Sequence, residues 1–185
     1  MTEFEDQYEA RFHFINDPTL RRNLGDALQQ VAELTVVSEG YDPIVKAGFL
    51  KMAIVITASI VEAVLHAYIK TKITDPILKN DWKYTGVKTF TTVSEVPRKE
   101  IVTAYREKPP LNLDDLQFND LIKILHDENL WSNNDLEKKT DELRKKRNNI
   151  HLMTLGRIDR EYSKEMVDEI FSTARKVLLM VEGGL

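Results

Sequence analysis

The segment from Ile44 to about Lys70 constrains the fold of this chain most strongly, because apolar residues occupy nearly every face of it. It follows Asp42-Pro43, which is a helix-start signal. Asp caps free backbone amides, and Pro at the first helical position loses no hydrogen bond. A helix that is apolar all round needs other elements around it. We therefore predict a helix at the centre of a helical domain.

Helix signals recur on both sides of this segment. Asp17-Pro18 repeats the start signal, the leucines after it recur at helical spacing, and Gly40 is placed to end that helix in the left-handed conformation. Asn134, with Glu137 three residues on, predicts an Asn-led capping box for a later helix. These signals indicate a mainly α fold of about four to five helices.

Two further helices are predicted, one that ends near Asn129 and a final one from near Ser163 to Gly183-Gly184. Between residues 82 and 108 the helical period fails, and β-branched and aromatic residues cluster on both sides of Pro97. This stretch predicts either a small β-hairpin insertion or a long loop.

The length of 185 residues suits a single domain over 1–185, with an irregular N-terminal lead at 1–16. Hydrophobic residues make up 42% and charged residues 30%, a balance typical of water-soluble globular proteins. The sequence has no cysteine and no targeting signal, and its longest apolar run, between Lys51 and Glu62, is short for a membrane span. We expect a cytoplasmic protein that does not bind membranes.

A local basic patch must carry any binding to nucleic acid, because the net charge of −4 gives no general attraction. The densest patch reads RKKRNNIH. Leu136, Leu143 and Ile150 recur every seven residues around it, and Arg147 falls at an intermediate position where a core residue is expected. A charged arginine at a core position requires a structural or functional explanation.

Arg144, Arg147 and His151 stand in an i, i+3, i+7 relation and so share one helical face. Guanidinium groups can bind a phosphodiester and stabilise developing charge, while an imidazole can move the proton of a ribose 2′-hydroxyl. Neither role requires a metal. The alternative is structural, because cations late in a helix favour the negative end of its dipole and a histidine there is commonly a cap.

Two segments resemble the HEPN domains, compact helical bundles found in many RNA-cleaving toxins and phage-defence nucleases. The sequence RNNIH, which ends at His151, is similar to the RNxIH form of their arginine–histidine motif. Three residues separate Arg147 from His151 and six separate Arg144 from it, so either arginine can be the counterpart. ITASIVEAVLHAYIK, in which Glu62 interrupts an apolar run, is similar to their early core helix. By order of elements the resemblance extends over about residues 43–182.

This resemblance implies an antiparallel HEPN-like helical bundle and a metal-independent endoribonuclease of the toxin or defence type. His151 would be the general acid or base, Arg147 or Arg144 would hold the phosphate, and Asn148 would orient it. Glu62 would be the acidic partner. The resemblance also implies a homodimer in which the motifs of two protomers face each other in one RNA-binding cleft, without a cofactor.

Other readings of the same residues compete with this one. Many HEPN-like chains are non-catalytic, so the alternative function is a dimeric interaction module that binds an antitoxin or effector protein.

Glu62 and His66 lie four residues apart on the core helix, and they either bond to a neighbouring helix or line a cleft. Aromatic residues of the 82–108 stretch either stack on unpaired bases or pack the hairpin onto the helices; they are Trp82, Tyr84, Phe90 and Tyr105. The scattered histidines, without an HExxH motif, indicate no metal site.

Overall fold

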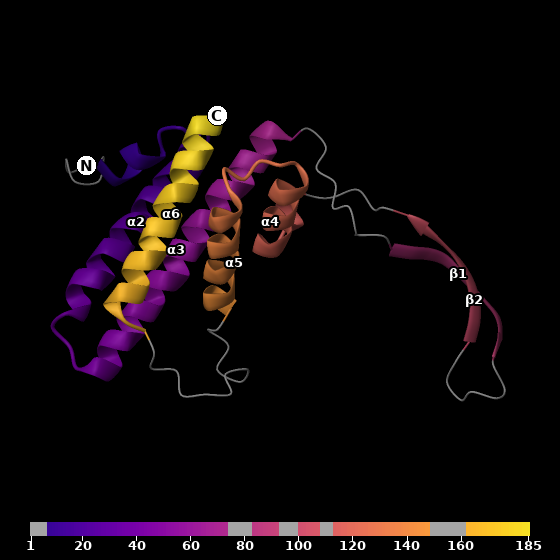
Figure 1. Ribbon diagram of the computed structural model, residues 1–185, viewed down its shortest axis with the longest axis horizontal. Coiled ribbons are helices and arrows are strands. Elements are labelled where there is room, and N and C mark those ends of the chain that lie inside the picture. The colour runs from indigo at the N-terminus through magenta and orange to yellow at the C-terminus, as the bar shows by residue number, and fades with distance from the viewer. Residues whose placement is uncertain (1–6, 74–82, 93–99, 108–112, 149–161) are drawn as a thin grey trace.

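The computed structural model describes residues 7–73, 83–92, 100–107, 113–148 and 162–185 (Figure 1). Over these residues the fold is mainly α, as predicted. In chain order the elements are η1 (Ala10–Phe12), α2 (Pro18–Ser38), α3 (Pro43–Lys72), β1 (Lys83–Thr92), β2 (Glu100–Glu107), η2 (Leu113–Asp115), α4 (Phe118–Asp127), α5 (Asn134–Asn148) and α6 (Lys164–Gly184).

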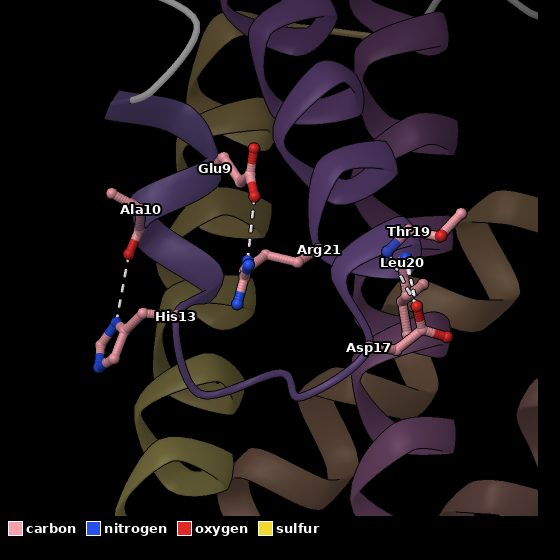
Figure 2. A network of polar contacts seen from close by, with 7 residues as sticks. All are labelled: Glu9, Ala10, His13, Asp17, Thr19, Leu20 and Arg21. Carbon is pink, nitrogen blue, oxygen red and sulfur yellow. Dashed lines mark hydrogen bonds and ion pairs between the residues drawn. The ribbon is translucent and has the colours of Figure 1, made fainter.

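Both Asp-Pro signals begin helices as predicted. The Asp17 carboxylate accepts hydrogen bonds from the backbone N–H groups of Thr19 and Leu20, at 2.9 and 3.1 Å (Figure 2). Asp42 caps the first turn of α3 in the same way. Each carboxylate therefore satisfies amides that the first turn of a helix cannot pair within itself.

The central helix of the bundle is α3, and α2, α4, α5 and α6 all pack against it. Figure 1 shows α2 and α3 running antiparallel, with α6 beside them. Twelve residues of α3 are buried, and ten of them form one hydrophobic core with residues such as Phe12, Leu24 and Phe118. The prediction that the apolar segment lies at the centre is confirmed.

By length and composition α3 could also cross a membrane, a test that core helices of soluble proteins pass as well. In this fold the other helices cover much of its apolar surface. The structure is therefore compatible with a soluble protein.

The prediction of an irregular lead over 1–16 is wrong for residues 7–12, whereas residues 13–16 form a turn and irregular chain. Residues 7–9 are helical and η1 follows them. Phe12 is fully buried, so contacts with the core hold this segment in place. Arg21 Nε of α2 donates to Glu9 Oε1 at 3.0 Å, and His13 Nδ1 lies 3.2 Å from the carbonyl oxygen of Ala10; Figure 2 shows both contacts.

The end of α2 also differs from its prediction. The helix ends at Ser38, and the backbone N–H groups of Glu39 and Gly40 bond back to the carbonyls of Val36 and Val37 at 3.2 and 3.1 Å. Gly40 does not adopt a left-handed φ. Because ordinary helical-turn bonds already pair these carbonyls, the turn does not need a left-handed residue.

In the connection from α4 to α5, the residue that caps α5 lies one position before the predicted one. Asn129 has a left-handed φ of 55° and lies just beyond the end of α4, as predicted. The Asn133 side-chain oxygen accepts from the backbone N–H of Leu136 at 2.8 Å, so Asn133 caps α5. Asn134 is already the first helical residue. In place of the capping box predicted between Asn134 and Glu137, the backbone N–H of Glu137 donates to the Asn133 carbonyl at 3.4 Å and the Glu137 carboxylate contacts His126.

Two antiparallel strands occupy the stretch for which a hairpin or a loop was predicted. Their register runs from Lys83 opposite Glu107 to Thr92 opposite Glu100, with two irregularities. In Figure 1 this strand pair lies to one side of the helices.

Candidate functional site

The helix that carries the basic patch, α5, packs one face into the core. Leu136, Thr140 and Leu143 are buried, and the Thr140 hydroxyl donates to the carbonyl of Leu136 at 2.8 Å. Arg147 follows Leu143 by one turn and is partly buried. The predicted core stripe is confirmed as far as Leu143, whereas Ile150 lies outside the described residues. This stripe directs Arg147 towards α3.

An ion pair explains why an arginine occupies that position. Arg147 Nη1 donates to Glu62 Oε1 at 3.1 Å, and Arg147 Nη2 lies 3.0 Å from Glu62 Oε2. The exposed fractions of the two side chains are 31% and 22%. Two parallel contacts are the bidentate geometry that guanidinium and carboxylate favour, and partial burial limits competition from water. Glu62 therefore holds the guanidinium of Arg147 against the core helix.

Arg144 has a different partner, on its own helix. Its Nε and Nη2 both lie 2.7 Å from Asp141 Oδ1, and Lys145 Nζ lies 2.7 Å from Asp141 Oδ2. One carboxylate thus contacts two cations. Burial raises the pKa of Asp141, but hydrogen bonds from Lys145 and Arg144 and their positive charge outweigh it and hold the pKa below its ordinary value.

The structure brings together only some of the predicted site residues. Arg147 and Glu62 are in contact, whereas Arg144 is held separately by Asp141. Asn148, the last residue of α5, is exposed. His151 lies outside the described residues, so its place beside the arginines remains a prediction.

His66, one turn after Glu62 on α3, contacts a backbone carbonyl of another element. His66 Nε2 lies 2.7 Å from the carbonyl oxygen of Leu113 in η2, and the imidazole is partly buried. Glu62 and His66 were expected either to bond to a neighbouring helix or to line a cleft. Both side chains bond to a neighbouring element, Glu62 to α5 and His66 to η2. His66 thereby ties η2 to the core helix.

The other described histidines form surface pairs. His13 Nε2 lies 3.3 Å from Glu182, and His126 Nδ1 lies 3.0 Å from Glu137. Within the part of the chain that the structure describes, no group of three or more histidine, aspartate or glutamate side chains could hold a metal ion.

Of the aromatic residues proposed for base stacking, Tyr84 and Phe90 lie on β1 and Tyr105 lies on β2. Trp82 falls outside the described residues. The choice between base stacking and packing of the hairpin therefore stays a prediction.

Sequence reasoning overlooked Asp141. Its signal was local, because a carboxylate three residues before Arg144 and four before Lys145 can reach both on one helix face.

Comparison with known protein families, with characterised proteins and with solved structures finds no match to this chain. The contacts of Glu62 and Arg147 are therefore the basis for a functional proposal.

Proposed function

We propose that this protein is a HEPN-like, metal-independent endoribonuclease that acts as a homodimer. The observation that supports the proposal is the Glu62–Arg147 pair. The resemblance to HEPN domains rests on two segments, and residues 85 positions apart, one from each segment, are in contact. This contact favours Arg147 over Arg144 as the arginine of the motif.

Arg147 can bind a phosphate while Glu62 holds it. A guanidinium carries five N–H donors, and Glu62 engages two of its nitrogen atoms. The exposed 31% of the side chain gives a ligand access to the remaining donors. A cation oriented in advance stabilises developing charge without further reorganisation.

In the proposed reaction the imidazole of His151 removes the proton from a ribose 2′-hydroxyl. The 2′ oxygen attacks the neighbouring phosphorus, the bond from phosphorus to the 5′ oxygen breaks, and the imidazolium returns a proton to that oxygen. The products are a 2′,3′-cyclic phosphate and a 5′-hydroxyl. Arg147 stabilises the charge that builds on the phosphate oxygens, and the amide of Asn148 orients them.

The test is incubation of purified protein with a mixed RNA substrate in the presence of a chelator. We expect cleavage that leaves cyclic phosphate ends, abolished in His151→Ala and reduced roughly 100-fold or more in Arg147→Ala, the effect of losing one charge-stabilising donor. His126→Ala is the matched control, because His126 pairs with Glu137 on the surface. Intact RNA, or equal cleavage by His151→Ala, would contradict the proposal.

A non-catalytic, HEPN-like interaction module is the second proposal, and one observation favours it. Both Arg144 and Arg147 already contact carboxylates, which lowers the positive charge available to RNA. As such a module the protein would bind an antitoxin or effector protein. This second proposal predicts that a partner protein co-purifies stably with the chain. RNA cleavage that depends on His151 would exclude the second proposal.

The homodimer and the cytoplasmic location belong to the same proposal. Light scattering should give about twice the chain mass of 21.4 kDa. If the protein is a monomer at the concentration used in the cleavage assay, a cleft shared by two protomers cannot be the site of cleavage. Fractionation of cells should find the protein in the soluble cytoplasmic fraction.

A further inference from the structure

A groove of about 550 Å³ lies between α4 and α5, and Arg144, one helical turn before the arginine that the proposed function uses, is part of its lining. Its α5 wall carries Lys138, Asp141, Arg144 and Lys145, and the α4 wall includes Asn119. The groove is open to solvent, so an extended chain can enter it from the side.

The charge of this groove comes mainly from α5. Asp141 is shared by Arg144 and Lys145 at 2.7 Å each, so these three residues together keep one positive charge. Lys138 adds another positive charge and Glu137, which lies 3.0 Å from His126 of α4, adds a negative one, so the charged side chains of the groove together keep one positive charge. Because the whole protein is acidic, with a net charge of −4, this local excess is where an anionic ligand is favoured.

We propose that this groove binds the phosphodiester backbone of the RNA strand and that Asp141 limits the affinity by competing with phosphate for Arg144 and Lys145. The inference rests on the proposed nuclease function. Arg144 lines the groove and Arg147 follows it by three residues, the spacing of neighbours on a helix surface, so a strand that contacts Arg144 comes close to the proposed cleavage site. Lysine and arginine on that path are the side chains that bind phosphate best.

The competition by Asp141 follows from its geometry. Both of its oxygens are engaged at short distances, so a phosphate that binds Arg144 or Lys145 must displace the carboxylate or share these cations with it. Removing the negative charge of Asp141 leaves both cations to the phosphate. Asp141→Asn should therefore bind RNA more tightly than the unaltered protein does.

The test measures binding of a fluorescent single-stranded RNA with 2′-O-methyl riboses, which cannot be cleaved, at several salt concentrations. For Asp141→Asn we expect tighter binding and a slope of log affinity against log salt steeper by about 0.7 per added phosphate contact. Its advantage should therefore shrink by about fivefold when salt rises tenfold. Arg144→Gln and Lys145→Gln should bind more weakly, and thermal melts check that each variant is folded.

Asp135→Asn is the matched control. It makes the same charge change on the same helix, but Asp135 pairs with Lys139 and lines a different hollow, towards α6. Equal gains in Asp135→Asn and Asp141→Asn would overturn the proposal, as would wild-type affinity in Arg144→Gln. Tighter binding of polyglutamate than of RNA of equal charge would overturn RNA as the ligand.

The groove and the nuclease can fail separately. If RNA cleavage depends on His151 but Asp141→Asn binds no better than Asp135→Asn, the groove proposal is wrong and the nuclease stands. If Asp141→Asn binds RNA more tightly but no variant cleaves it, the nuclease proposal is wrong and the groove stands.

Discussion

At the level of single residues, the contact between Glu62 and Arg147 links the C-terminal turn of α5 to the core helix. Glu62→Gln keeps the shape of the side chain but removes its charge, which leaves the partly buried guanidinium with a weaker acceptor. We expect a loss of about 1–2 kcal/mol in the free energy of unfolding, between the values for surface and buried ion pairs. Urea unfolding measures this loss.

Glu39→Gln is the control for that measurement. It removes an ion pair with Lys46 in which the glutamate side chain is 51% exposed, so water already screens the interaction. The loss should be clearly smaller than for Glu62→Gln. Equal losses would show that the Glu62–Arg147 pair behaves as an ordinary surface pair.

Two helical glycines should respond oppositely to alanine. At Gly48 in α3 an added Cβ meets no atom within 4 Å, so Gly48→Ala should stabilise the protein by up to about 1 kcal/mol through helix propensity. At Gly25 in α2 the Cβ would lie 2.9 Å from backbone atoms of Glu9. Gly25→Ala should therefore destabilise, by about 1–3 kcal/mol. Thermal melts compare them, and a shift of both in the same direction would contradict the close packing of residue 9 on α2.

At the level of elements, the start of α5 offers a test between two adjacent asparagines. The Asn133 side chain accepts the hydrogen bond that caps the helix, while Asn134 is the first helical residue. Asn133→Ala should cost about 1 kcal/mol, and Asn134→Ala should be close to neutral because alanine is the better helix former. Chemical denaturation of the two variants measures this difference. The reverse ranking would favour the capping box that the sequence suggests.

At the level of the whole molecule, acid should weaken the fold partly through Asp141. Its pKa, like those of Glu39 and Glu165, lies below the ordinary value, so the folded state binds protons less readily than the unfolded state. The stability that Asp141 supplies is therefore complete above its ordinary pKa of about 4 and is lost as pH falls through the folded pKa.

Asp141→Asn tests this sign. The variant should be less stable than the unaltered protein at pH 7, and the difference should shrink as the pH falls below about 4. Urea unfolding at pH 7, 5 and 3 measures it. A difference that stays constant across this range would mean that Asp141 titrates alike in both states.

Much of the helical framework could be predicted from the sequence because caps act over a few residues. Asp17, Asp42 and Ser163 each accept backbone N–H groups at the start of a helix, as their positions indicate. The errors fell where neighbouring local signals were equivalent. Two adjacent asparagines could each cap α5, and the turn at Gly40 could close with or without a left-handed residue.

For the site, the sequence alone determined that Glu62 interrupts an apolar helix and that Arg147 falls on a core-facing stripe. Both follow from helical periodicity, which sets the direction of a side chain on its own helix. Only the tertiary structure decided that Arg147 meets Glu62 while Arg144 turns to Asp141. That choice depends on how α5 packs on α3, and spacing along one helix carries no information about a partner 85 residues away.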